Sequence, residues 1–379
     1  MSKAAEVPIL ETDAVACHFT SGQGFFGSKQ VVRAVDEISL TVRQGETLAI
    51  VGESGCGKST LARLMVQLRR PTSGRVFYDG QDISNLSERD LRHLRKDLQF
   101  VFQDPFSSLN PRMTVGAIIE EPMTVHTTFT RTERRRKVAE LLRKVGLRAE
   151  FSNRYPHEFS GGQRQRIGIA RALASGPKVI IADEPVSALD VSVQAQVINL
   201  LEDLKEEFNL TLVLIAHDLA VIRHMSDRIA VMYLGEIVER AETDALFDKP
   251  LHPYTQALLK AIPIPSPHSR TTEPGLVGDI PSPLAPPPGC RFHTRCPHAT
   301  DQCNTEKPLL SDAGQGRFVA CHHWKDIVAQ TNSKTGEPPR TEIAAKRFAL
   351  YRDWSENKKS AQLNSPPERP APQRSTENA

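Results

Sequence analysis

Short apolar runs without polar alternation recur along the first 250 residues, and each is followed by a loop and a helical pattern. Three of these runs are Thr47–Val51, Val179–Ala182 and Thr211–Ala216, which consist largely of Val, Ile, Leu and Ala. An apolar run of this length is typical of a strand that is buried on both faces, as in a parallel sheet covered by helices. The pattern therefore predicts an α/β core.

One later segment has the helical period instead. Over residues 131–145, the apolar residues Val138, Leu141, Leu142 and Val145 fall on one helical face, and several arginines and lysines occupy the rest. This spacing predicts an amphipathic helix. Its basic face has two interpretations, an ordinary solvated surface or a contact for an acidic partner.

Proline marks the end of the packed core. Residues 1–249 contain 8 prolines, whereas residues 250–300 contain 12. We therefore expect a packed domain over residues 8–250 and a Pro- and Cys-rich extension over 251–324. The polar, charged residues 325–379 have the composition of a disordered tail.

The bulk composition narrows the class of protein. The 379 residues are 39% hydrophobic and 25% charged, which suffices for a sizeable core and excludes collagen-like and fully disordered chains. The net charge of +3 is too small to indicate nucleic acid as the default partner. There is no apolar run of transmembrane length and no N-terminal secretory pattern, so we expect a cytosolic protein whose membrane role, if any, is peripheral.

A glycine-rich loop follows the first apolar run. Residues 52–59 match the pattern G-x-x-x-x-G-K-[ST] between a predicted strand and a predicted helix over 60–68. In such a loop, backbone N–H groups face phosphate oxygens, Lys58 neutralises phosphate charge and Ser59 binds Mg²⁺. The alternative is a chance match to a short pattern. Cys56 fills a variable position, as a small filler rather than a redox switch. The residues predicted to bind the nucleotide here are Gly52, Ser54, Gly55, Cys56, Gly57, Lys58, Ser59 and Thr60.

Two acids end the second apolar run. Asp183 and Glu184 follow Val179–Ala182 directly. Asp183 can complete the Mg²⁺ site, and Glu184, pointing differently, can polarise the attacking water as a general base. Taken alone, the pair could instead cap the next helix.

Further motifs lie between and after these sites. Phe159–Arg166 reads Phe-Ser-Gly-Gly-Gln-Arg-Gln-Arg, Gln103 lies in Val-Phe-Gln-Asp-Pro, Ser187–Asp190 reads Ser-Ala-Leu-Asp, and His217 follows the third apolar run. Ser-Gly-Gly alone could be a turn and a helix N-cap. Together, and in this order, the motifs resemble those of ABC-type ATPases, with Phe159 in place of the usual leucine of the signature motif.

The resemblance implies a fold and a set of roles. The fold is a P-loop NTPase nucleotide-binding domain with a helical subdomain over about 104–172. Gln103 resembles the glutamine that senses Mg²⁺ and a membrane partner, His217 the histidine that contacts the γ-phosphate, and Asp190 the residue that communicates across a dimer. Ser160, Gly161, Gly162 and Gln163 would bind the ATP of the facing subunit, and Phe19 would stack on adenine, with Phe25 and Phe26 as alternatives.

Finer matches indicate a branch of the family. The segments 102–111, 154–157, 252–258, 281–284 and 287–292 resemble the ATP-binding subunits of bacterial dipeptide/oligopeptide importers, particularly the second of the two paired ATPases. The resemblance covers about residues 10–325. It implies peptide uptake with a partner ATPase, two membrane permeases and an external solute-binding protein, on the cytoplasmic face of the membrane. Because some relatives transport nickel, glutathione or sugars, one of these solutes is the alternative to a peptide.

Four cysteines crowd into the extension. Cys290, Cys296, Cys303 and Cys321 offer four thiolates, the donor set of a [4Fe–4S] cluster or a tetrahedral Zn²⁺. The resemblance favours the iron–sulfur cluster, in a structural role, because some members of the family hold one there. Zinc is the alternative metal, because four histidines lie nearby in the sequence, namely His293, His298, His322 and His323.

Two other classes of function compete with the importer. A soluble ABC-type ATPase acting on DNA or ribosomes usually has a coiled-coil insertion or two tandem cassettes, and this chain has one cassette with about 100 residues between Lys58 and Ser160. A non-catalytic metal-bearing subunit would have a damaged ATP site. Lys58, Asp183, Glu184 and His217 are all present.

Overall fold

The computed structural model describes most of the first 329 residues. By its contacts the chain divides into two units, residues 1–328 and 329–379. The residues that the structure describes are 7–21, 30–104, 106–187, 189–216, 219–262, 278–327 and 329.

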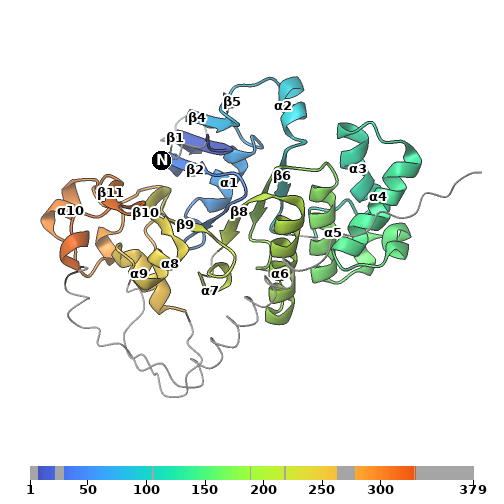
Figure 1. The fold of residues 1–379 in the computed structure, drawn as a ribbon. Helices are drawn as coiled ribbons and strands as arrows, with labels where there is room; N and C mark the ends of the chain where they lie inside the picture. The colour runs from blue at the N-terminus through green and yellow to red at the C-terminus, as the bar shows by residue number, and fades with distance from the viewer. Residues whose placement is uncertain are drawn as a thin grey trace, which may run out of the picture. The chain divides into compact units, whose positions relative to one another are not determined.

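An eight-stranded sheet forms the centre of the first unit, with the strand order β11-β12-β10-β9-β3-β8-β7-β6 (Figure 1). The three predicted strands, β3, β7 and β8, are confirmed. β8 lies in the middle, and β3 and β7 pair with it in parallel on either side. The parallel α/β core is therefore confirmed. The strands are β3 (Thr47–Val51), β6 (Leu98–Val101), β7 (Val179–Asp183), β8 (Thr211–Ala216), β9 (Arg228–Tyr233), β10 (Glu236–Glu242), β11 (Ser311–Gly314) and β12 (Arg317–Val319).

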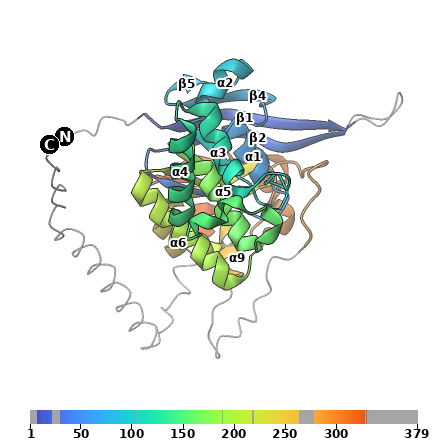
Figure 2. The same ribbon diagram turned by 90° about the vertical axis from the view of Figure 1, so that its right-hand side faces the viewer.

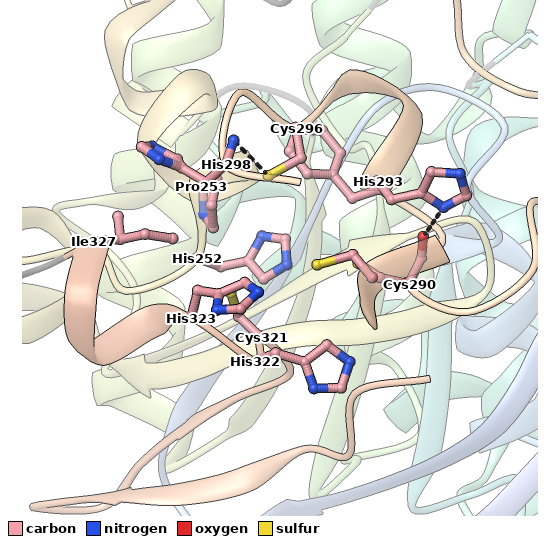
Figure 3. Close-up of a pocket in the computed structure, with 12 residues that line it drawn as sticks. His252, Pro253, Cys290, His293, Cys296, His298, Cys321, His322, His323 and Ile327 are labelled. Atoms are coloured by element: carbon pink, nitrogen blue, oxygen red, sulfur yellow. Dashed lines mark hydrogen bonds between the residues drawn. The ribbon is translucent and has the colours of Figure 1, made fainter. Parts of the chain in front are cut away.

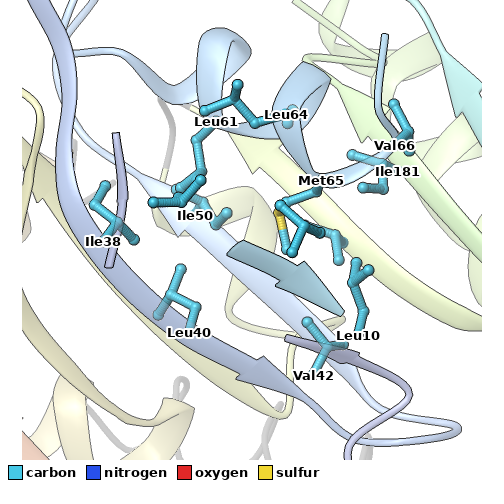
Figure 4. Packing of buried hydrophobic residues seen from close by; sticks show 14 of the residues in the cluster. Leu10, Ile38, Leu40, Val42, Ile50, Leu61, Leu64, Met65, Val66 and Ile181 are labelled. Carbon is cyan, nitrogen blue, oxygen red and sulfur yellow. The ribbon is translucent and has the colours of Figure 1, made fainter. Parts of the chain in front are cut away.

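A second, antiparallel sheet covers the helix that follows the glycine-rich loop. Its order is β2-β1-β4-β5, and α1 (Lys58–Met65) packs between it and the central sheet. Figure 4 shows Leu61 and Met65 of α1 together with Leu40 of β2 and Ile50 of β3. This apolar packing fixes the start of α1 relative to both sheets. The strands are β1 (Leu10–Ser21), β2 (Gln30–Val42), β4 (Ser73–Tyr78) and β5 (Gln81–Asp82).

A group of helices packs around a second apolar cluster, on the side of the first unit that faces the viewer in Figure 2. The predicted amphipathic helix is α4 (Arg131–Lys144), and its apolar face is buried as expected. Thr130 caps α4 and forms a reciprocal capping box with Glu133. On the basic face, Arg134 binds Glu120 with Nε 2.7 Å from Oε1. The other helices of this region are α3 (Val115–His126), α5 (Gly161–Leu173) and α6 (Val191–Phe208), with the 3-10 turns η1 (Ala149–Asn153) and η2 (Pro156–Glu158). The short helix α2 (Glu88–Leu94) is not part of this group, and its Leu94 packs against the first apolar cluster.

The extension continues the central sheet. Its strand β12 pairs with β10, so residues after the proline-rich boundary complete a sheet that begins near the N-terminus. A third apolar cluster joins Tyr233 of β9 to Tyr254 and Phe292 from the extension. Among the described residues, no helix has the length and apolar character needed to cross a membrane. The remaining helices are α7 (Leu219–Ile222), α8 (Thr243–Asp248), α9 (Pro253–Lys260), α10 (Asp301–Thr305) and the 3-10 turn η3 (His293–Arg295).

Candidate nucleotide site

The glycine-rich loop joins β3 to α1 and depends on two glycines in the left-handed backbone region. Gly52 has φ 153° and Gly57 has φ 106°. A Cβ at Gly52 would lie 2.1 Å from the Met232 carbonyl oxygen, and one at Gly57 would lie 1.9 Å from the Ala34 carbonyl oxygen. No side chain fits at either position. Ser54 and Gly55 form the exposed crest between them.

Lys58 lies beneath this loop at the first position of α1. Its side chain is buried, and Nζ donates to the carbonyl oxygens of Gly52 at 2.8 Å and Glu53 at 2.9 Å. Gly57 is the N-cap residue and brings no capping side chain to the start of α1. A helix start of this kind offers backbone N–H groups and a positive dipole end to an anion. The loop, Lys58 and the start of α1 together form a candidate phosphate cradle.

Ser59 and Asp183 bring two oxygen donors together. Ser59 Oγ donates to Asp183 Oδ1 at 2.8 Å, across 124 residues of sequence. Burial at the end of β7 raises the pKa of Asp183. A hydroxyl and a carboxylate are the ligands that Mg²⁺ takes beside a bound nucleotide, so the predicted Mg²⁺ residues fit that ion.

Glu184 and Gln103 form the next pair. Glu184 has φ 43°, an uncommon backbone conformation for a non-glycine residue, and its N–H donates to the carbonyl oxygen of Ile215 at 3.0 Å. Gln103 Nε2 donates to Glu184 Oε2 at 2.8 Å. After the turn at the end of β7, Glu184 pairs with Gln103, whereas Asp183 pairs with Ser59. Strain of this kind clusters at functional sites.

The Ser-Gly-Gly motif starts α5. Ser160 is the N-cap, its Oγ accepts from the Gln163 N–H at 3.4 Å, and Gln163 Oε1 accepts from the Ser160 N–H at 3.1 Å. A Cβ at Gly162 would lie 2.5 Å from a Val193 methyl group, so this glycine allows α5 to approach α6. Ser160 is exposed. The motif is thus a helix N-cap whose hydroxyl also faces solvent.

The remaining predicted residues differ in what surrounds them. Asp190 is the exposed N-cap residue of α6. Phe19 packs partly on the apolar core, and the Arg69 guanidinium lies 4.0 Å from its ring centre. Cys56 is buried, and burial raises the pKa of its thiol, as suits a small filler. Phe25, Phe26 and His217 lie outside the described residues.

Two residues that the sequence reasoning missed contact the loop from the extension. Arg295 donates to the Glu53 carboxylate from both terminal guanidinium nitrogens, Nη1 and Nη2, and Tyr254 Oη accepts from the Glu53 backbone N–H at 2.8 Å. Glu53 occupies a variable position of the loop pattern. No local signal in the sequence connects it with residues more than 200 positions away.

The four clustered cysteines line one pocket of the extension. Figure 3 shows Cys290, Cys296 and Cys321 around it, and Cys303 completes the set. Burial raises the pKa of the Cys290 thiol to about 11 and that of Cys321 to about 12. Within the described part of the chain, no three His, Cys, Asp or Glu side chains are arranged as a metal-binding group.

Histidines share the lining of this cysteine pocket, and several have other partners. His293 Nδ1 lies 2.8 Å from the Cys290 carbonyl oxygen, and His322 Nε2 lies 3.0 Å from that of Glu306. His323 Nε2 lies 2.8 Å from Thr300 Oγ1. These three histidines therefore have hydrogen-bond partners other than the thiols.

Known proteins match both the core and the extension. Residues 35–187 match the ABC transporter family, and residues 238–303 match the family described as oligopeptide/dipeptide transporter, C-terminal region. The oligopeptide transport ATP-binding protein AppF of Bacillus subtilis (strain 168) is 56% identical over 326 residues, which are 85% of this chain and 99% of AppF. The dipeptide transport ATP-binding protein DppF of Escherichia coli (strain K12) is 49% identical over 314 residues, covering 83% of this chain and 94% of DppF.

The fold also has solved relatives. The dimeric structure of a post-hydrolysis state of the ATP-binding cassette MJ0796, bound to ADP and Pi, is 32% identical with a TM-score of 0.56. It covers 62% of this chain and 98% of its own length. Over the matched part, the fold of this chain is thus that of an ATP-binding cassette.

Proposed function

The chain belongs to the ATP-binding proteins of the oligopeptide/dipeptide ABC transporters, and on this basis we propose that it powers the uptake of dipeptides or oligopeptides across the cytoplasmic membrane. ATP hydrolysis coupled to transport is the activity of this family. A peptide substrate is supported by the names of two relatives, one an oligopeptide and the other a dipeptide transport protein. Nickel, glutathione or a sugar is the alternative solute.

The ATPase assignment is supported mainly by one observation. Three groups of residues lie together at the carboxyl edge of the parallel strands. Lys58 follows β3, the Ser59–Asp183 pair joins α1 to the end of β7, and the Gln103–Glu184 pair joins the segments after β6 and β7. The carboxyl ends of parallel strands are where open α/β sheets bind ligands. The phosphate cradle, the proposed Mg²⁺ ligands and the proposed general base therefore lie at one edge of the central sheet.

We propose a task for each of these residues. The start of α1 and Lys58 would bind and orient the β- and γ-phosphates, and Ser59 and Asp183 would hold a Mg²⁺ ion, which would supply charge neutralisation. Glu184 accepts the proton of the attacking water. Gln103 donates to Oε2 of the same carboxylate and so holds its orientation.

Hydrolysis requires a second nucleotide-binding subunit. The exposed Ser160 hydroxyl and the N-terminus of α5 suit a phosphate delivered by a facing subunit. The dimeric ADP-bound cassette supports this arrangement by homology. We infer that the chain pairs with a second ABC ATPase, docks as a peripheral subunit on two permeases at the cytoplasmic face, and receives solute from an external binding protein.

A pair of matched capping variants tests both the peptide substrate and the shared site. Ser160→Ala and Thr130→Ala each remove the hydroxyl of a capping box at a helix start, so each is expected to cost about 1 kcal/mol of stability. Only Ser160 would face a phosphate. In membranes holding the complete transporter, Ser160→Ala should therefore lower ATP-driven uptake of labelled dipeptides by at least about tenfold, and Thr130→Ala should not.

Each outcome of that experiment has a distinct meaning. Equal uptake by the two variants would contradict a role of Ser160 at the partner's ATP. If the unaltered transporter hydrolyses ATP but takes up neither dipeptides nor longer peptides, that result would contradict the peptide substrate.

We further propose that the four cysteines of the extension hold a [4Fe–4S] cluster, with Zn²⁺ as the alternative. Four thiols line one pocket, and thiolates are the ligands of both groups. Binding would deprotonate thiols whose pKa burial raises, so the bound metal would supply the charge that stabilises them. The role would be structural, since the Pro-rich extension has little apolar core of its own.

Metal analysis of anaerobically purified protein tests this cysteine site. We expect iron and acid-labile sulfide in about equal amounts with the visible absorbance of a cluster, and loss of both in Cys296→Ser. Cys17→Ser is the matched control, since Cys17 is buried in β1 outside the cysteine pocket. Colourless protein that contains zinc would contradict the cluster.

A further inference from the structure

The phosphate loop is held from outside the ATPase core, by the extension. We propose that Arg295 is a positioning residue of the ATP site, which holds Glu53 and through it Lys58 and so sets the affinity for MgATP. The inference rests on the proposed ATPase function and deepens it. It assigns the extension a direct part in nucleotide binding.

The contact between Arg295 and Glu53 is a two-pronged ion pair. Arg295 Nη1 lies 2.7 Å from Glu53 Oε2, and Nη2 lies 3.0 Å from Oε1. The Arg295 side chain is 4% exposed and that of Glu53 is 21% exposed. Paired charge-assisted hydrogen bonds of this geometry fix orientation as well as distance. The Glu53 carboxylate is therefore held in one place.

Tyr254 holds the backbone of the same residue. Its hydroxyl oxygen accepts from the Glu53 N–H at 2.8 Å. The Tyr254 ring is fully buried and packs on Tyr233 and Phe292, with ring centres 4.7 and 5.4 Å away. Both the side chain and the backbone of Glu53 are thus fixed by residues beyond position 250.

Because Glu53 contacts Lys58, these contacts also restrict the movement of the phosphate cradle. Its carbonyl oxygen accepts from Lys58 Nζ at 2.9 Å, so a displacement of Glu53 moves an anchor of the ammonium group that meets phosphate. A loop that is already held in its binding conformation loses less conformational freedom when ATP binds. The arrangement favours an effect on ATP affinity over an effect on the chemical step.

The position of Arg295 also depends on the cysteine pocket. Arg295 ends η3, and Cys290 and Cys296 flank this turn on either side. The Cys296 N–H donates to the His293 carbonyl oxygen at 3.2 Å, which closes the turn. The fold of the pocket therefore sets where the guanidinium lies.

Arg317 provides a matched control. It is a second buried arginine of the extension, and it lies in β12 beside the buried Glu239 with Nη2 3.6 Å from Oε1. It also donates to the Lys249 carbonyl oxygen. Arg317 thus joins the extension to the core in the same manner, at a place without a contact to the phosphate loop.

The test compares variants of the full-length protein in its assembled transporter. Arg295→Gln and the isosteric Glu53→Gln should each weaken MgATP binding about tenfold and raise the KM for ATP in parallel, with kcat within about twofold. Arg295→Lys should restore part of the affinity, because it keeps the charge but not the two-pronged geometry. The double variant should be no weaker than either single variant, since both remove one interaction.

The control separates positioning from stability. Arg317→Gln should lower the melting temperature while leaving the MgATP dissociation constant within about twofold. Unchanged MgATP affinity in Glu53→Gln, or equal losses of affinity in Arg295→Gln and Arg317→Gln, would overturn the proposal. Absence of MgATP binding by the unaltered protein would instead overturn the proposed function on which it rests.

Discussion

Replacement of Glu184 by glutamine is expected to stop ATP turnover and leave ATP binding intact. The carboxylate is the proposed acceptor of the proton of the attacking water, and an amide cannot take that proton. Loss of a positioned general base lowers turnover by about 10²–10⁴-fold. The amide oxygen can still accept the hydrogen bond that Gln103 now donates to Glu184 at 2.8 Å, so the loop geometry should persist.

Phosphate release by the assembled transporter, together with the MgATP dissociation constant, measures this effect. Glu207→Gln is the control, because it makes the same chemical change at an exposed carboxylate that pairs with Lys144 on the protein surface. That variant should keep normal turnover. Turnover by Glu184→Gln above about one tenth of the normal rate would contradict the assignment of the base.

The second large effect is expected at Gly57. Gly57→Ala places a methyl group 1.9 Å from the Ala34 carbonyl oxygen and 2.7 Å from a Met232 methyl group, at a φ of 106°. Backbone of β2 has to move to admit it, and the phosphate loop moves with α1. We expect a loss of about 3–5 kcal/mol in the free energy of unfolding and no measurable MgATP binding.

Gly55 supplies the matched comparison within the same loop. Its φ is 79°, but a Cβ there would meet no atom within 4 Å. Gly55→Ala therefore carries only the cost of a left-handed backbone, about 1 kcal/mol. Chemical denaturation of both variants measures the difference. A similar loss of stability at the two positions would show that backbone conformation, and not the contact with β2, makes Gly57 necessary.

Local patterns were sufficient for the elements of the core. The strands Thr47–Val51 and Thr211–Ala216 match β3 and β8 residue for residue, and the amphipathic segment matches α4 to within one residue. Each signal, an unalternating apolar run or a 3.6-residue period, is contained within a short window. The glycine-rich loop is equally local, because its glycines, lysine and serine are consecutive parts of one turn.

The order of the strands in the sheet is not a local property. The sequence places β3, β7 and β8 in that order, yet β8 lies between the other two. Strands that are all apolar on both faces carry no pattern that distinguishes their neighbours. Pairing depends on the summed packing of helices on both faces of the sheet.

The sequence by itself determined the α/β class, the ATP-binding loop, the acidic pair and the cysteine-bearing extension. Each of these features can be predicted from residues that are close together in the sequence. Only the tertiary structure decided that the extension completes the central sheet and that Arg295 meets Glu53, 242 residues away. A buried ion pair forms where the packing of separate elements brings two charges together and excludes water. That packing is a property of the whole folded unit, so no segment of the chain encodes it alone.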